Sequence, residues 1–142
     1  HALAGLRVGY ALGSAALIEG LTRVKDSFNS YPLDASAQLV AEAAIQDEQW
    51  LNESSQTVIE NRLELTEALL DLGFEVCPSL ANFVFVKHPA HEGRVLFEHL
   101  RERNILVRRW DKAPIADYLR ITVGTKAECA ALLQCLAEKC AR

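Results

Sequence analysis

Arginines inside apolar stretches are the residues of this sequence best suited to chemistry. Arg7 follows a glycine-punctuated loop and precedes an apolar run that ends at Gly13, and Arg120 interrupts the apolar run Leu119–Val123. A permanent cation in such a place costs free energy unless an anion meets it. The planar guanidinium binds a carboxylate or phosphate through two parallel hydrogen bonds, which a lysine cannot match. Both positions therefore predict anion binding.

Each arginine also has a simpler explanation, and the residues alone leave it open. Arg7 could pair with a carboxylate inside the core, and Arg120 could face solvent from its strand. Arg108 ends the preceding predicted strand, and Arg109 directly follows it. Adjacent strand residues face opposite sides of a sheet, so only one of them can share a cleft with Arg120. The residues alone leave open whether that residue is Arg108 or Arg109.

The histidines and cysteines are weaker candidates for metal-binding or catalytic residues. His88 and His91 share a polar loop, but no cysteine, aspartate or third histidine is placed in the sequence to complete a metal site, so none is predicted. His99 is predicted to be a satisfied helix residue rather than a catalyst. None of the four cysteines belongs to a C-x-x-C pair, so their thiols are predicted to be free and buried: Cys77, Cys129, Cys135 and Cys140. Free thiols predict a reducing, cytoplasmic setting.

The first half of the chain predicts one strand followed by helices. The apolar run Val8–Leu12, bounded by glycines, predicts a strand buried on both faces. Ser14 is predicted to cap one helix, two further helices are predicted over Asp34–Ile45 and Asp47–Leu72, and Gly73 should end the last. The charged residues of the long helix are predicted to form a solvated face: Glu60, Arg62, Glu64 and Glu67.

After Gly73 the hydrophobic period changes to that of short strands. The order β-β-α-β-β-α describes a compact α+β domain with helices covering one side of a small sheet. We predict residues 1–33 to be the end of a larger domain, 34–72 to be linking helices, and 73–142 to be a small C-terminal domain. The predicted elements are strands Phe74–Cys77, Asn82–Val86, Ile105–Arg108 and Leu119–Val123, a helix Glu92–Arg103, and a last helix from the capping box Thr125–Glu128 through Cys140.

Composition excludes several partners. The 142 residues carry a net charge of −4 without a stripe rich in lysine and arginine, so nucleic acid is not expected to bind. No apolar run approaches the length of a membrane span, and no signal peptide is visible. The sequence starts with histidine and contains no methionine, so we expect it to be a piece of a longer protein.

Several of these segments resemble one family. The stretch A-L-A-G-L-R-V-G-Y-A, the Y-P-L at Tyr31 and the L-R-I-T-V-G-T around Arg120 are similar to histidinol-phosphate aminotransferases, which are fold-type I enzymes of class I/II dependent on pyridoxal 5'-phosphate. Asn82 also recurs in similar enzymes and is expected to pack. The resemblance implies an α/β transferase-like fragment. It comprises the last strand and helix of the large domain, a long linking helix and a small α+β domain.

The resemblance also implies roles for the arginines. Arg7 would bind the cofactor phosphate, while Arg108 and Arg120 would hold the anionic end of the substrate, so that the three guanidinium groups grip two anions in one pocket. Tyr31 would line the substrate cleft or simply pack. By the family's spacing, the Schiff-base lysine falls two residues before His1. This chain alone should therefore be inactive.

The implied reaction moves an amino group between histidinol phosphate or imidazole acetol phosphate and glutamate or 2-oxoglutarate, in histidine biosynthesis. The implied enzyme is a cytoplasmic homodimer. Two alternatives stay open. One is a sister enzyme that uses the same cofactor, such as an amino-acid phosphate decarboxylase or another aminotransferase. The other is a non-enzymatic ligand-binding or interaction domain, which the same β-β-α-β-β-α arrangement could serve.

Overall fold

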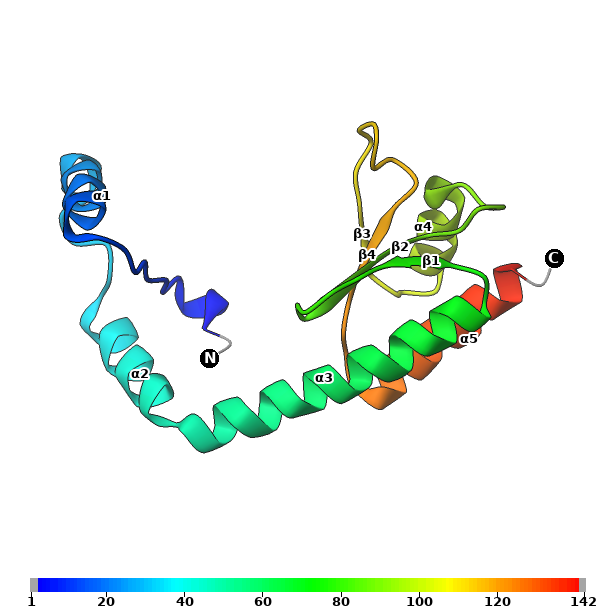
Figure 1. Cartoon of the computed structure of the whole chain (residues 1–142), viewed down its shortest axis with the longest axis horizontal. Coiled ribbons are helices and arrows are strands. Elements are labelled where there is room, and N and C mark those ends of the chain that lie inside the picture. The colour runs from blue at the N-terminus through cyan, green and yellow to red at the C-terminus, as the bar shows by residue number, and fades with distance from the viewer. Residues whose placement is uncertain (1–2, 141–142) are drawn as a thin grey trace. The chain divides into compact units, whose positions relative to one another are not determined.

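A computed structural model describes residues 3–140 of the chain (Figure 1). The chain divides into two compact units, His1–Glu53 and Ser54–Arg142, and each is described by itself. The division falls inside the longest helix, α3 (Glu48–Asp71), which occupies the span predicted for a long helix. Across the described residues, no helix is both long enough and apolar enough to cross a bilayer.

The first unit contains helices at the predicted places. A short 3-10 helix, η1 (Ala4–Leu6), is followed by α1 (Ala15–Phe28) and α2 (Ala35–Gln46). Asp34 caps α2 as predicted, since its Oδ1 accepts the Ala37 N–H at 2.8 Å. Ser14 does precede α1, but its side chain makes no capping hydrogen bond.

The strand predicted over Val8–Leu12 does not form. These residues lie outside any helix or strand, and the side chains of Tyr10 and Leu12 are 76% and 89% exposed. A strand is stable only beside another strand that takes up its backbone hydrogen bonds. The strands of the described chain form one sheet in the second unit, and none pairs with this segment.

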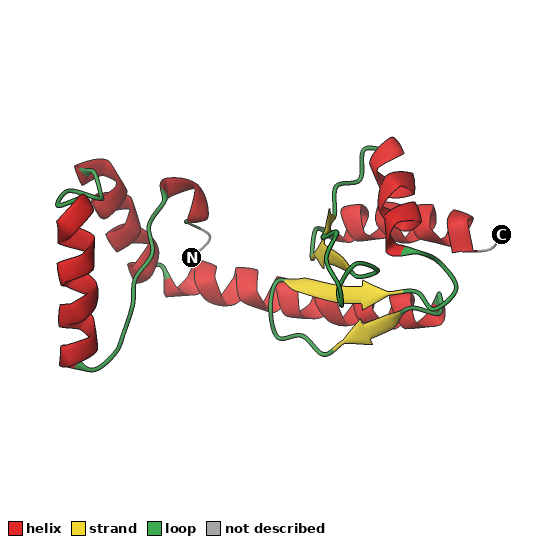
Figure 2. Ribbon diagram, turned by 90° about the horizontal axis from the view of Figure 1, so that it is seen from above, coloured by secondary structure: helices red, strands yellow, loops and turns green. Residues whose placement is uncertain are grey.

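The second unit is an antiparallel sheet with helices on one face (Figure 2). The predicted order β-β-α-β-β-α is confirmed, and the strands lie side by side in the order β1-β2-β4-β3. The third strand starts later than predicted, at Arg108 instead of Ile105. After α3 the elements are β1 (Glu75–Cys77), β2 (Phe83–Lys87), α4 (Gly93–Glu102), β3 (Arg108–Arg109), β4 (Leu119–Thr122) and α5 (Lys126–Cys140).

The core lies between the sheet and its helices. Every second residue of the central strands points to this side and is almost fully buried: Val84 and Val86 on β2, Leu119 and Ile121 on β4. The helices contribute the facing leucines, namely Leu65 and Leu69 of α3, Leu96 and Leu100 of α4, and Leu132 and Leu136 of α5. Because side chains alternate along a strand, the residues between these project from the opposite side. We call that side the open face.

The ends of the helices follow the predicted signals. Gly73 has φ +85 and ends α3, with its N–H donating to the Leu70 carbonyl at 2.9 Å and the Phe74 N–H donating to the Leu69 carbonyl at 3.0 Å. Thr125 and Glu128 form the predicted capping box, since the Thr125 N–H donates to the Glu128 carboxylate at 2.7 Å.

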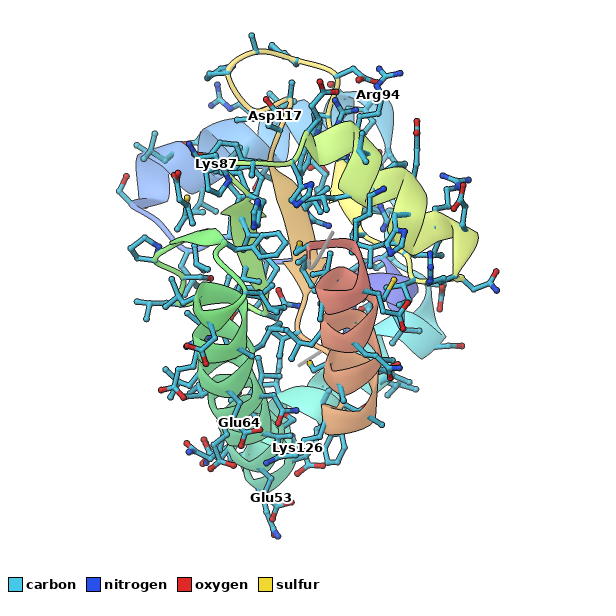
Figure 3. The ribbon with its side chains drawn as sticks, turned by 90° about the vertical axis from the view of Figure 1, so that its right-hand side faces the viewer. Glu53, Glu64, Lys87, Arg94, Asp117 and Lys126 are labelled. Atoms are coloured by element: carbon cyan, nitrogen blue, oxygen red, sulfur yellow. The ribbon has the colours of Figure 1, made fainter. Side chains whose placement is uncertain are left out.

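The long helix departs from the prediction at one position. Arg62 is only 7% exposed, so it is not part of a solvated face. Its Nη1 donates to the Ala81 carbonyl at 2.7 Å and ties α3 to the loop before β2. Glu64 does face solvent and pairs with Lys126 of α5 at 2.7 Å (Figure 3).

Candidate functional site

Two of the predicted arginines lie directly opposite each other on the open face. In the register of β3 and β4, Arg108 pairs with Arg120, and Arg120 in turn pairs with Phe85 of β2. Directly paired residues of neighbouring strands project from the same side of a sheet. The side chains of Arg108 and Arg120 therefore leave the sheet together, away from the core.

Arg109 projects from the other side. Its partner in the register is Leu119, which is fully buried in the core. The Arg109 side chain is 10% exposed, and its Nη1 donates to Oδ1 of Asp111 at 2.6 Å. The same carboxylate oxygen accepts a hydrogen bond from Arg94 at 2.7 Å. These two guanidinium groups, Arg109 first, lower the pKa of Asp111 below its ordinary value. Arg109 is thus already paired with an acid.

Aromatic rings flank the two arginines of the open face. The guanidinium carbon of Arg108 lies 4.9 Å from the ring centroid of Trp110, and that of Arg120 lies 5.9 Å from the same ring and 5.3 Å from Phe83. A cation over an aromatic face is attracted by the ring quadrupole. Trp110 therefore holds both guanidinium groups next to one indole ring.

More aromatic residues continue this surface. Phe85 stacks on Tyr118 with ring centroids 4.6 Å apart and meets Trp110 edge-on. The sequence had not predicted a role for these rings. The alternation Phe83-Val84-Phe85-Val86 was the available signal, because a strand with valines on its core side must present both phenylalanines on the other side.

The electrostatics of the pair favour an anion. Within residues 3–140, neither Arg108 nor Arg120 makes an ion pair or a side-chain hydrogen bond, and Nε of Arg120 is buried without a partner. Like charges directly opposite each other on a sheet repel. A phosphate or carboxylate between them would remove the repulsion and supply acceptors to both guanidinium groups. The geometry is therefore suited to holding an anion between aromatic rings.

Arg7 lies in the first unit, in an unusual backbone conformation. It follows η1 with φ 60 and ψ 26, in the left-handed region that non-glycine residues rarely occupy. Its side chain is exposed, and its Nη1 makes one long hydrogen bond, 3.4 Å, to the Ala4 carbonyl. The prediction that Arg7 enters a buried strand is wrong, because that strand is absent. The guanidinium has no acidic partner among the described residues.

Other residues singled out in the sequence have clear places. Tyr31 is 92% exposed, so it does not pack within the first unit. His99 is half-buried, and its Nε2 contacts the Cys135 carbonyl at 3.0 Å, which confirms the prediction of a satisfied helix residue. All four cysteines are free, as predicted, but the prediction that they are buried holds only for Cys135, and the other three are half-buried. Near His88 and His91 the structure places Cys140, a third donor atom that was not predicted from the sequence.

Comparison with known proteins defines the class. Residues 1–136 match the family described as "Aminotransferase class I and II". The chain belongs to this family.

Individual members of the family are similar to this chain in sequence over nearly its whole length. The chain is 57% identical over 138 residues to histidinol-phosphate aminotransferase 2 of Rhizobium meliloti (strain 1021); the match covers 97% of this chain and 39% of that relative. The chain thus spans about two fifths of the relative's length.

Solved structures show the same fold. The crystal structure of histidinol-phosphate aminotransferase from Sinorhizobium meliloti in complex with pyridoxal-5'-phosphate is similar with a TM-score of 0.84 and 25% identity, over 98% of this chain and 38% of that one. A decarboxylase from Sulfurospirillum multivorans is similar with a TM-score of 0.80 and 26% identity, over 97% of this chain and 40% of that one. The predicted fold class, a fragment of the α/β fold of these transferases, is confirmed.

Proposed function

We propose that the whole protein to which this chain belongs is a histidinol-phosphate aminotransferase of histidine biosynthesis. It would move an amino group between histidinol phosphate and 2-oxoglutarate, with imidazole acetol phosphate and glutamate as the other pair. The observation that carries the proposal is the arginine pair of the open face. Arg108 and Arg120 are cross-strand neighbours with no acidic partner among the described residues. The relatives are histidinol-phosphate aminotransferases, and a substrate that carries a phosphate fits such an anion site.

The arginine pair would hold the anionic end of the substrate. A phosphate offers several acceptor oxygens, enough for both guanidinium groups at once. Trp110 would keep the two side chains extended over one ring, so that less side-chain freedom is lost when the anion binds. Arg120 would contribute most, because its Nε is already buried without a partner.

Arg7 would hold the phosphate of pyridoxal 5'-phosphate. Its guanidinium fits this group, because it is exposed and has no ion pair among residues 3–140, with one long bond to a backbone carbonyl. When bound, the cofactor supplies the electron sink for the transfer of an amino group. The part of this chain would be to fix the cofactor's charged end and to orient the substrate.

We propose that the lysine that carries the cofactor lies outside residues 1–142. By the spacing of the family it precedes the G-L-R segment that contains Arg7. The five lysines of the sequence all follow that segment: Lys25, Lys87, Lys112, Lys126 and Lys139. These residues alone are therefore expected to lack aminotransferase activity.

The assembly and its location are proposals as well. The apolar residues on α1 are strongly exposed within the described chain, with Leu17 at 68%, Leu21 at 56% and Phe28 at 78%. Exposed apolar surface of this kind supports packing against the rest of the protein or a second subunit, so we propose a homodimer. Four free cysteines support a reducing compartment, and we place the enzyme in the cytoplasm.

The test is Arg120→Ala in the full-length enzyme. Hydrogen bonds to charged groups contribute about 1.5–3 kcal/mol, so the KM for histidinol phosphate should rise roughly 10- to 150-fold. Cofactor binding, followed by its absorbance, should not change. Arg101→Ala is the matched control, since Arg101 is an exposed arginine on α4. An unchanged KM in Arg120→Ala would remove this residue from the site.

A second candidate is an amino-acid phosphate decarboxylase on the same scaffold. The similarity to the decarboxylase structure favours it, and the same arginine pair would suit its anionic substrate. The two reactions give different products, since a decarboxylase releases carbon dioxide and leaves 2-oxoglutarate untouched. Incubating the full-length enzyme with histidinol phosphate and 2-oxoglutarate and measuring glutamate therefore separates them.

A further inference from the structure

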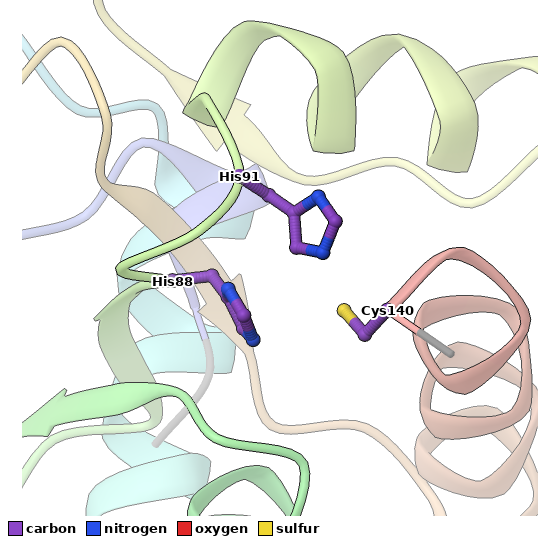
Figure 4. Close-up of side chains that lie close together, drawn as sticks. All are labelled: His88, His91 and Cys140. Atoms are coloured by element: carbon purple, nitrogen blue, oxygen red, sulfur yellow. The ribbon is translucent and has the colours of Figure 1, made fainter. Parts of the chain in front are cut away.

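We propose that His88, His91 and Cys140 form a zinc-binding site, separate from the open face. One ligand atom from each of these residues lies within 4.8 Å of the other two. The two histidines come from the loop after β2, and Cys140 is the last residue of α5, so the fold brings together segments about fifty positions apart (Figure 4). The proposal goes beyond the aminotransferase function and does not depend on it.

His88 is held in place by the core. Its ring packs edge-on against Phe74, with centroids 4.9 Å apart, and Phe74 is only 3% exposed. Its Nε2 lies 3.2 Å from the Leu72 carbonyl, and its Nδ1 accepts the Ala90 N–H at 3.1 Å. A neutral imidazole has one lone pair and one N–H, so zinc at Nδ1 would replace the Ala90 contact, while the Nε2–H would keep its hydrogen bond to the Leu72 carbonyl. A retained ring N–H to a backbone carbonyl is the usual way in which a ligating histidine is oriented.

His91 and Cys140 need less rearrangement. The His91 ring lies beside His88, with centroids 4.7 Å apart, and points toward Cys140 in Figure 4. The Cys140 thiol is half-buried and free, and burial raises its pKa. Zinc binding would form one Zn–S and two Zn–N bonds, release the thiol proton to water and keep one water molecule as the fourth ligand.

The donor set selects the metal. Imidazole nitrogen and thiolate sulfur are the common zinc ligands, with bonds of about 2.0–2.1 and 2.3 Å. In a tetrahedral centre such bonds place nitrogen and sulfur about 3.5 Å apart. The present separations, up to 4.8 Å, must therefore shrink by about 1 Å, which rotation of the side chains can supply. Calcium and magnesium prefer oxygen ligands and are not expected to bind here.

The experiment is zinc titration of the whole protein, followed by calorimetry and by zinc X-ray absorption. We expect one zinc per chain, with one sulfur and two histidine nitrogens in the first shell. His91→Gln and Cys140→Ser should each raise the Kd for zinc by at least about a hundredfold. Mutation of a residue that only hydrogen-bonds to a metal ligand already lowers metal affinity 10- to 100-fold, and these two variants remove a ligand itself. Cys129→Ser is the matched control, a half-buried cysteine of the same helix, and should leave the Kd unchanged.

The variants separate a metal site from a purely structural cluster. Circular dichroism would show whether each variant is folded, and His91→Gln lies in a loop, so it tests the ligand role even if Cys140→Ser unfolds. Loss of zinc binding in folded His91→Gln supports the site. Absence of stoichiometric zinc, a first shell without sulfur, or equal affinity in His91→Gln and the parent protein would overturn it.

Discussion

The two arginines of the open face should be coupled energetically, and an anion should reverse the sign of that coupling. Without an anion, the directly opposed charges of Arg108 and Arg120 repel by about 0.2–1 kcal/mol. Each also interacts with Trp110, which contributes about 0.5–1 kcal/mol at an exposed site. Replacing Arg108 by glutamine removes both the repulsion and the contact with Trp110. Because these two effects have opposite signs, the free energy of unfolding should change by less than about 1 kcal/mol.

Phosphate should change this balance. At a phosphate concentration one hundred times its Kd, binding stabilises the protein by about 2.7 kcal/mol. If each arginine contributes a hundredfold to affinity, a single variant keeps only about 0.4 kcal/mol of that stabilisation, and the double variant almost none. The coupling between the two positions is then favourable by about 2 kcal/mol.

The assay is a double-mutant cycle of Arg108→Gln and Arg120→Gln, measured by urea unfolding at low salt with and without phosphate. Low salt is used because dissolved ions screen the interaction between exposed charges; the screening length is about 10 Å at 0.1 M salt and grows as the salt concentration falls. Arg101→Gln combined with Arg120→Gln is the control and should be additive within about 0.5 kcal/mol. A coupling that stays the same when phosphate is added would refute the shared anion site.

The remaining predictions concern the scaffold. The Thr125 N–H and hydroxyl lower the pKa of Glu128, so the stability that Glu128 contributes should be lost as the pH falls below about 4.5; Glu128→Gln should flatten that part of the pH–stability curve in thermal unfolding. Gly93→Ala should destabilise strongly, because a Cβ would lie 2.5 Å from the Asp117 carbonyl oxygen, whereas Gly20→Ala on α1 has open space and should stabilise by about 0.5–1 kcal/mol in chemical unfolding. Leu69→Ala should cost about 2–5 kcal/mol by the same measurement, because Leu69 is fully buried in the core.

Local patterns predicted the elements whose stabilising contacts are local. Asp34, Gly73 and the Thr125–Glu128 capping box mark helix ends through hydrogen bonds that span a few residues, and each is found where the sequence predicts it. The segment Val8–Leu12 has an equally clear strand pattern, yet a strand depends on a partner that no local pattern supplies. Arg62 was misassigned for a similar reason, since its partner is a carbonyl nineteen positions away.

The candidate site depended on contacts between distant segments. The alternation of β2 indicates which of its residues leave the core, but the pairing of Arg108 with Arg120 is a matter of register between a two-residue strand and its neighbour. The position of Trp110 beside both arginines follows from that register and from the turn after β3. His88, His91 and Cys140 show the same limit, because the sequence gives no sign that α5 ends beside the loop after β2.

In our proposal the two sides of the second unit's sheet have different roles: one side stabilises the fold and the other would bind the anion. On one side, Val84, Val86, Leu119 and Ile121 bury their side chains under three helices and fix the positions of β2 and β4. On the other side, the same strands present Arg120, Phe83 and Phe85, which are half-buried, and Arg120 lies opposite the like charge of Arg108. An anion bound between Arg108 and Arg120 would remove their repulsion and form new hydrogen bonds with both guanidinium groups. Variants of the open face should therefore affect ligand affinity far more than folding, whereas variants of the core face should do the reverse.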